Sequence, residues 1–272
     1  MEEYRTLTVD PNRETTERNG DQSIAVSVVV AVRDPERAAS LRELYRAYKE
    51  QLEKVDRTYE FIFALEGNQP ENIETLRTLR EEGEPITVLV FEKWYGGATA
   101  LSAGFDHASG SVLVTLPAYH QIDPEAIPAL FPALEDSDMV VVRRWPRQDG
   151  WATQLQVRGF HAVLRKLLGV EFNDLGCSVV AFRREVLDSI DMYGDQHRFL
   201  PVLTSHYGFK VKEVEAPQTE EDTFQRHLSF RGYVARILDL LSIFFLTKFT
   251  RKPLRFFGAS GVCALLAGGG IS

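Results

Sequence analysis

Short apolar runs alternate along the chain with segments whose apolar residues recur at helical spacing. The runs are rich in Val, Ile and Phe and are bounded by Gly, Pro or polar clusters, which is typical of buried strands. Strands are therefore expected at residues 24–32, 59–64, 86–91, 112–116, 139–142, 178–182 and 208–214. The last of these runs alternates in polarity, which indicates an edge or hairpin strand.

Helices are expected between these strands, where apolar residues recur every three or four positions. They fall near residues 41–52, 73–79, 98–108, 163–168, 184–190 and 199–206. The segment at 98–108 is rich in small residues, so it predicts a helix that packs closely on its neighbour. Strands that alternate with helices predict an α/β fold with a parallel sheet and right-handed crossovers.

The loop after the strand at 112–116 is the centre of the candidate site. Pro117 cannot donate a hydrogen bond to a sheet, so we expect the strand to stop there. Asp123 is expected to cap a helix that begins with Pro124 and Glu125. A strand, a polar loop and a helix in this order present side chains at the carboxyl end of a strand, where α/β sheets bind ligands.

Composition and charge narrow the class of protein. The chain has 272 residues, of which 44% are hydrophobic and 26% charged, as in a globular protein with a substantial core. A net charge of -8 gives no general case for nucleic-acid binding. The two cysteines, Cys177 and Cys263, do not suggest a structural disulfide, which fits a reducing compartment. Residues 1–23 are polar and acidic, so we expect a flexible tail without a secretory signal.

The pattern changes after residue 225. Aromatic and aliphatic residues between Phe230 and Phe245 fall on one helical face, and seven basic residues accompany a single acid over 226–255. This combination predicts amphipathic helices in a membrane interface. The alternative is an ordinary amphipathic helix packed on the sheet.

Residues 256–272 are almost free of charge but are shorter than the roughly 20 residues that a spanning helix needs. They are expected to be a truncated transmembrane segment, a re-entrant segment or a buried hairpin. The basic run at 248–255 predicts that this segment starts on the cytoplasmic side. We therefore expect a membrane-associated protein at the cytoplasmic face.

Several segments together carry a resemblance to a known family. They are the helix at 100–110, the loop Pro117-Ala118-Tyr119-His120-Gln121, and residues 173–178, 197–201, 208–214 and 253–258. Over roughly residues 26–261 the chain resembles family 2 glycosyltransferases of the GT-A fold, close to the polyprenyl-phosphate (dolichol-phosphate-type) hexosyltransferases. The resemblance implies a Rossmann-like α/β domain at 24–225, with a mostly parallel sheet flanked by helices. Juxtamembrane helices at 226–255 and the start of a membrane segment at 256–272 would follow.

The resemblance also implies where a nucleotide sugar binds. The residues at the matching positions are Ala31, Arg33, Glu66, Lys93, Tyr119 and Gln121. Glu66 stands where family acids contact the base and ribose; the alternative is a solvated loop acid. In the family, aspartates at the positions of Pro117 and Tyr119 hold Mg²⁺ or Mn²⁺, and Gln121 alone is retained here. No metal ligands, and therefore no cofactor, are expected in this chain.

Four further residues match positions that handle phosphate or the acceptor. Arg144 and Arg158 stand where the family grips phosphates, for which the planar guanidinium is suited; the alternative is a surface charge cluster. Asp174 matches an acid near the acceptor, where it could act as a base; the alternative is a turn-forming residue before Gly176. Arg198 would meet the phosphate of a lipid acceptor.

Three hypotheses follow. The first is a membrane-associated glycosyltransferase that moves a hexose from a nucleotide sugar to a polyprenyl phosphate without the usual metal motif. The second is a catalytically inactive homologue that serves as a binding or assembly subunit at the membrane, because several acids around one ligand are replaced together. The third is a soluble nucleotide-binding α/β protein. A homo-oligomer is left open.

Overall fold

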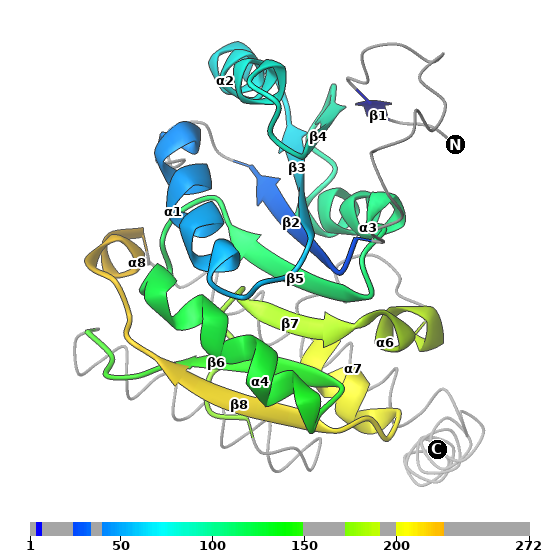
Figure 1. Ribbon diagram of the computed structural model, residues 1–272, viewed down its shortest axis with the longest axis vertical. Coiled ribbons are helices and arrows are strands. Elements are labelled where there is room, and N and C mark those ends of the chain that lie inside the picture. Colours follow the sequence, from blue (N-terminus) through cyan, green and yellow to red (C-terminus); the bar gives the residue numbers. More distant parts are fainter. Residues whose placement is uncertain (1–3, 7–23, 34–39, 149–171, 191–199, 226–272) are drawn as a thin grey trace, which may run out of the picture.

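The computed structural model describes residues 4–6, 24–33, 40–148, 172–190 and 200–225, and their centre is an eight-stranded sheet (Figure 1). The strand order is β1-β4-β3-β2-β5-β7-β6-β8. The strands are β1 (Tyr4–Thr6), β2 (Val26–Val32), β3 (Tyr59–Glu66), β4 (Ile86–Phe91), β5 (Val112–Pro117), β6 (Met139–Arg144), β7 (Val180–Arg183) and β8 (Val211–Ala216). The expected α/β architecture is therefore confirmed for the described residues.

The sheet is mixed and mostly parallel. Strands β4, β3, β2 and β5 pair in parallel, and β6 pairs in parallel with β8. Strand β7 is antiparallel to both β5 and β6, and β1 is antiparallel to β4. The expectation of a mostly parallel sheet is confirmed, and β1 and β7 are the antiparallel strands among the described residues. The strand β6 ends at the same edge of the sheet at which β7 begins. The two strands can therefore pair in antiparallel without a crossover connection.

Helices cover both faces of the sheet. One face carries α1 (Leu41–Glu53), α2 (Pro70–Glu81), the 3-10 helix η1 (Pro124–Ala129) and α4 (Leu130–Glu135). The other face carries α3 (Gly97–His107), α6 (Arg184–Ser189) and α7 (Leu200–His206). The short helix α8 (Glu220–Gln225) follows the carboxyl end of β8.

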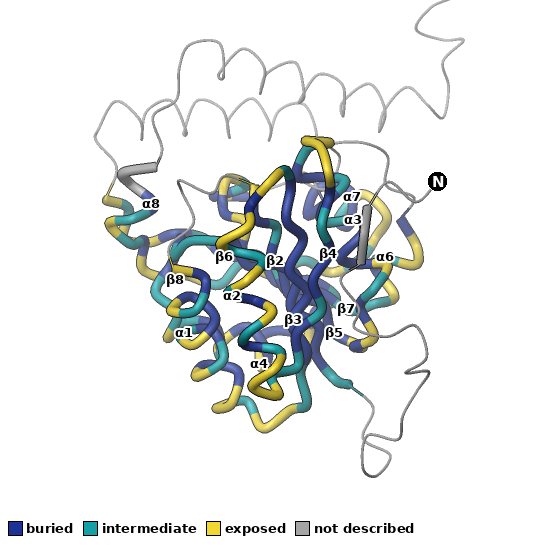
Figure 2. The backbone as a smooth tube through the Cα atoms, turned by 90° about the horizontal axis from the view of Figure 1, so that it is seen from above, coloured by how far each residue is buried: buried dark blue, intermediate teal, exposed yellow. Residues whose placement is uncertain are grey.

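The central strands are buried on both faces, which explains their continuous apolar runs (Figure 2). In β2, Val28 and Val30 pack in the core under α1, whereas Val29 packs in the core under α3. Gly104 of α3 lies directly over Val29, because a Cβ at this glycine would stand 2.3 Å from Val29 Cγ1. The small-residue helix is thus packed closely on the sheet, as expected.

Local expectations around the central loop are largely met. The side chain of Asp123 caps the next helix by accepting a hydrogen bond of 3.0 Å from the Glu125 backbone N–H. The first turns are 3-10 rather than α-helical, and β5 runs through Pro117, one residue further than predicted.

Expectations at the two ends of the chain are tested only in part. Residues 4–6 form a strand inside the segment expected to be a flexible tail. The helix predicted at 163–168 and the segments at 226–255 and 256–272 lie outside the described residues. Within the described residues, no helix has the length and apolar character needed to cross a membrane.

Candidate functional site

The sheet brings the predicted nucleotide-binding residues to one edge. Ala31 lies near the carboxyl end of β2, where it is in register with Ala64 of β3 and Pro117 of β5. Glu66 ends β3, and Lys93 follows the end of β4 as an exposed residue. Parallel strands that end together form the crevice at which α/β folds bind ligands.

Glu66 is buried at this edge, with only 1% of its surface exposed. Its Oε1 accepts a hydrogen bond of 3.1 Å from the backbone N–H of Tyr95, in the loop after β4. Its Oε2 is buried and has no hydrogen-bond partner. The alternative that Glu66 is a solvated loop acid is therefore wrong.

Arg33, at the end of β2, reaches across the same edge. Its side chain lies over Gly97 at the start of α3, where a Cβ would stand 2.9 Å from Arg33 Cδ. Glycine at this position lets the guanidinium stem lie against the backbone. The Arg33 side chain thereby connects the carboxyl end of β2 to the start of α3.

The loop from Pro117 to Gln121 is held from two sides. The hydroxyl of Tyr48, on α1, lies 3.0 Å from the carbonyl oxygen of Pro117 and 3.1 Å from that of Tyr119. On the other side, Gln121 Oε1 accepts a hydrogen bond of 2.6 Å from the Ser178 backbone N–H, and its Nε2 donates to the Tyr119 hydroxyl at 3.1 Å. The loop is therefore a fixed part of the site.

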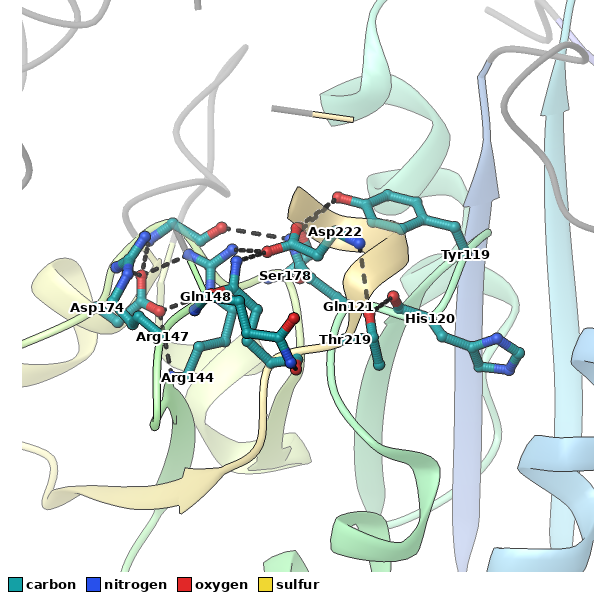
Figure 3. A network of polar contacts seen from close by, with 12 residues as sticks. Tyr119, His120, Gln121, Arg144, Arg147, Gln148, Asp174, Ser178, Thr219 and Asp222 are labelled. Atoms are coloured by element: carbon teal, nitrogen blue, oxygen red, sulfur yellow. Dashed lines mark hydrogen bonds and ion pairs between the residues drawn. The ribbon is translucent and has the colours of Figure 1, made fainter. Parts of the chain in front are cut away.

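Arg144 lies between two carboxylates beside this loop (Figure 3). Its Nε and Nη2 each donate a 2.6 Å hydrogen bond to Asp174, and its Nη1 donates one of 2.9 Å to Asp222. All three side chains are buried, and Arg147 Nη1 approaches Asp174 at 3.8 Å. Asp222 also contacts the Tyr119 hydroxyl at 3.4 Å, so the cluster and the loop are one polar network.

This pairing determines the charge states in the network. Burial alone lowers the pKa of Arg144, but the hydrogen bonds and charge of Asp174 outweigh it, so the pKa is raised overall. Burial raises the pKa of the neighbouring Cys177 thiol to about 12, and the thiol is neutral at physiological pH. Arg144 is thus a permanent cation that donates its hydrogen bonds to two buried carboxyl groups.

The structure also separates the roles that had been left open for these residues. Arg144 is buried and does not belong to a surface charge cluster, whereas Arg143 next to it pairs with Glu215 at the surface. Asp174 accepts a hydrogen bond of 3.0 Å from the Gly176 backbone N–H, so it does form the turn. The same carboxyl group also accepts hydrogen bonds from the Arg144 guanidinium.

Asp222 was missed by the sequence reasoning. It lies on α8, in the acidic run Glu220–Asp222 that follows β8. Glu221 of the same run accepts a hydrogen bond of 3.0 Å from the His120 backbone N–H. The available signal was the acidic run that begins a helix after the strand expected at 208–214. That strand was expected only to form an edge or a hairpin, so the acids after it were not included in the site.

The donor set does not fit the metal ion that the family resemblance implies. Among the described residues, no group of three or more His, Cys, Asp and Glu side chains could hold a metal ion. Asp222, the acid that contacts the Tyr119 hydroxyl, is hydrogen-bonded to Arg144. The expectation of a site without metal stays a prediction, and Arg158 and Arg198 lie outside the described residues.

Comparison with known proteins places the chain in a family. Residues 27–191 match the model of glycosyl transferase family 2, and the chain belongs to this family. It is 30% identical over 245 residues to the undecaprenyl-phosphate 4-deoxy-4-formamido-L-arabinose transferase of Sodalis glossinidius (strain morsitans), covering 89% of this chain and 73% of the relative. The protein of the same name from Proteus mirabilis (strain HI4320) is 29% identical over 245 residues, again covering 89% of this chain and 73% of the relative.

Solved structures confirm the GT-A fold. Glucosyl-3-phosphoglycerate synthase from Mycobacterium tuberculosis in complex with UDP superimposes with a TM-score of 0.59 at 19% identity, covering 84% of this chain and 86% of that one. The same enzyme with Mn²⁺, UDP-glucose and phosphoglyceric acid gives 0.59 at 18% identity, with coverage of 82% and 79%.

Proposed function

We propose that this protein transfers a hexose from a nucleotide sugar to a polyprenyl phosphate at the cytoplasmic face of a membrane. The observation that carries the proposal is the 30% identity to an undecaprenyl-phosphate sugar transferase over 89% of the chain. The geometry supports it, because the residues matched to the nucleotide-sugar site converge on one edge of the sheet. The basic and aromatic segment at 226–255 supports a membrane location.

The nucleotide sugar would bind across the carboxyl ends of β2, β3 and β4, against Ala31, Glu66 and Lys93. Its diphosphate would lie towards the loop of Tyr119 and Gln121. Negative charge develops on the departing nucleoside diphosphate and must be stabilised by fixed cations or dipoles. Arg144 is already neutralised by two carboxylates, so we assign that role to Arg158.

The acceptor requires little base catalysis. A phosphate monoester has a second pKa of about 6, so the oxygen that attacks the sugar already carries negative charge at neutral pH. Asp174, which is committed to Arg144, is therefore assigned a positioning role rather than that of a base. Arg198 would meet the acceptor phosphate.

The direct test is an assay of sugar transfer to a polyprenyl phosphate. The full chain in detergent is incubated with undecaprenyl phosphate and UDP- or GDP-sugars, each with and without Mn²⁺ and with excess chelator. We expect a glycolipid product that survives the chelator. Calorimetric titration with the same nucleotide sugars provides the binding arm. A chain that binds none of them would contradict the proposal.

One observation favours a second candidate, an inactive homologue that acts as a binding or assembly subunit. Arg144 and Asp174, two of the four residues matched to phosphate or acceptor positions, bind each other in the buried network. Nucleotide-sugar binding without any turnover, over a full set of sugars and polyprenyl phosphates, would support this candidate. Turnover with any donor would remove it.

A further inference from the structure

Large exposed aromatic side chains gather at one edge of the sheet. Among the described residues, the exposed large hydrophobic side chains are Trp94, Tyr95, Trp145 and Tyr207. Trp94 and Tyr95 follow the carboxyl end of β4, and Trp145 follows that of β6. Strand β6 runs in the same direction as β4, because it is antiparallel to β7, which is antiparallel to β5. Three of these four aromatic residues therefore lie at the carboxyl edge, whereas Tyr207 lies before β8 at the amino edge.

The loop that carries Trp94 is fixed at its base. The backbone N–H of Tyr95 donates a hydrogen bond of 3.1 Å to Glu66, and the centroid of the Tyr95 ring lies 6.1 Å from that of Phe91. One side of the indole rests against Gly67, where a Cβ would stand 2.9 Å from Trp94 Nε1. The rest of the residue faces outwards, since 62% of it is exposed. Apolar surface held outwards in this way marks a contact with a partner, a ligand or a membrane.

Trp145 is held in a similar way on the other side of the sheet. Its backbone N–H donates a hydrogen bond of 2.8 Å to the carbonyl oxygen of Ala216, and the Arg143 guanidinium lies over its ring at 5.1 Å. Five strand spacings of about 4.8 Å separate β4 from β6, so the two indoles stand on the order of 24 Å apart. Two rings at this separation cannot enclose one base or one sugar. A shared role for Trp94 and Trp145 therefore requires an extended partner surface.

The course of the chain identifies this partner as a membrane. Strand β8 is parallel to β6 and ends at the same edge. Helix α8 follows, and its Glu221 accepts a hydrogen bond of 3.0 Å from the His120 backbone N–H in the loop after β5. Gln225 ends α8, and the next residues begin the basic and aromatic segment predicted to lie in a membrane interface. The edge that exposes the aromatic rings is thus the edge from which the chain enters that segment.

We propose that the carboxyl edge of the sheet lies on the membrane surface, with the rings of Trp94 and Trp145 inserted among the lipid headgroups. This inference rests on the membrane location in the proposed function. Tryptophan and tyrosine are enriched at membrane–water interfaces, because their amphipathic rings suit the headgroup level. Two anchors so far apart fix the tilt of the domain. Strand β5 lies between β4 and β6, so the loop of Tyr119 faces the lipid surface between the two anchors.

The test locates each ring with lipids that quench tryptophan fluorescence. The tryptophans of the chain are Trp94, Trp145 and Trp151. Two full-length variants keep one of them each: Trp145→Phe/Trp151→Phe and Trp94→Phe/Trp151→Phe. Each is bound to vesicles of phosphatidylglycerol and phosphatidylcholine, with and without bromine on the upper acyl carbons. Both remaining tryptophans are expected to lose fluorescence in the brominated vesicles and to shift their emission to the blue on binding.

The matched control carries its probe on the opposite edge. In a chain whose three tryptophans are all changed to Phe, Tyr207→Trp puts an indole at a residue that is 51% exposed. This probe should keep its fluorescence in the same vesicles. As a second measurement, Trp94→Ala and Trp145→Ala should each weaken vesicle binding about 3- to 30-fold, because each removes apolar area from the interface. Circular dichroism of every variant checks that the fold is kept.

The outcomes separate this inference from the proposed function. Quenching of Trp94 and Trp145 without quenching of the Tyr207→Trp probe is the expected result. If the chain binds vesicles and shows any other pattern, or if both Ala variants bind vesicles as the unchanged protein does, this inference is overturned and the membrane location stands. Rings that shift to the blue without being quenched would belong to a contact between proteins. If the chain binds no vesicles, this inference and the membrane location both fail, and the transfer assay in detergent still decides the proposed reaction.

Discussion

Arg144 holds Asp174 through two parallel hydrogen bonds of 2.6 Å, and the exposed fractions of the two side chains are 0% and 2%. This fork-to-carboxylate geometry is the strongest form of an arginine ion pair. It joins the end of β6 to the turn before β7 at the edge where ligands are expected. Both residues are therefore parts of the framework of the site.

Loss of Asp174 should destabilise the protein more than loss of Asp222. Asp174 accepts from the Arg144 backbone N–H, from Nε and Nη2, and from the Gly176 backbone N–H. Asp222 accepts one hydrogen bond from Arg144, one from Gln218 and a longer one of 3.4 Å from the Tyr119 hydroxyl. We expect Asp174→Asn to cost about 3–5 kcal/mol, since it unbalances a buried charge, and Asp222→Asn about 1–2 kcal/mol.

Urea unfolding of the two variants measures this difference. The control is Arg143→Gln, which breaks a surface pair with Glu215 and should change the free energy of unfolding by less than about 1 kcal/mol. Equal costs for Asp174→Asn and Asp222→Asn would show that Arg144 depends on both carboxylates alike.

Much of the fold could be predicted from polarity, and the reason is visible in β2. A run of valines buried on both faces can only be a central strand or a buried helix, and its length decides for a strand. The direction of β7 could not be predicted in this way. A run of apolar residues carries no information on strand direction. The direction depends on the edge of the sheet at which the preceding connection ends.

The site was predictable only where resemblance supplied positions. Glu66, at the end of β3, and Gln121, in the loop after β5, were proposed because their positions match a family pattern. Asp222 matches no motif, and its role follows from the approach of α8 to Arg144, which is a tertiary contact. Likewise, the buried Oε2 of Glu66 is a property of packing that no spacing encodes.

Tyr48 is expected to position the loop of Tyr119. Its hydroxyl is the group on α1 that reaches two loop carbonyl oxygens, and its ring is buried. Tyr48→Phe should lower the free energy of unfolding by about 1–2 kcal/mol and speed hydrogen exchange of the amides at 119–121. Tyr59→Phe is the control, because its hydroxyl makes only an exposed contact of 3.4 Å with Glu53. Unchanged exchange in Tyr48→Phe would mean that the contacts of Gln121 and Glu221 hold the loop without Tyr48.

The contact between Gly104 and Val29 offers a test of the packing beneath the site. Gly104→Ala places a methyl group where Val29 Cγ1 already lies, and such overpacking costs about 1–3 kcal/mol, partly offset by the better helix propensity of Ala. In the background of Val29→Ala, the same change should cost much less. Thermal unfolding of the two single variants and the double variant gives the coupling energy. Additive effects would contradict direct overpacking.

The thiol of Cys177 should make the stability of the protein depend on alkaline pH. Burial raises its pKa from 9.0 to about 12; the charge of Arg144 opposes this shift, and that of Asp174 adds to it. The unfolded chain therefore loses the thiol proton above about pH 9, while the folded chain keeps it. This contribution to stability is complete below pH 9 and falls by about 1.4 kcal/mol per pH unit as pH rises towards 12. Urea unfolding of the unchanged protein and of Cys177→Ala from pH 7.5 to 10.5 should show the two curves converging by about 1–2 kcal/mol. Parallel curves for Cys177→Ala and the unchanged protein would show that the Cys177 thiol titrates normally.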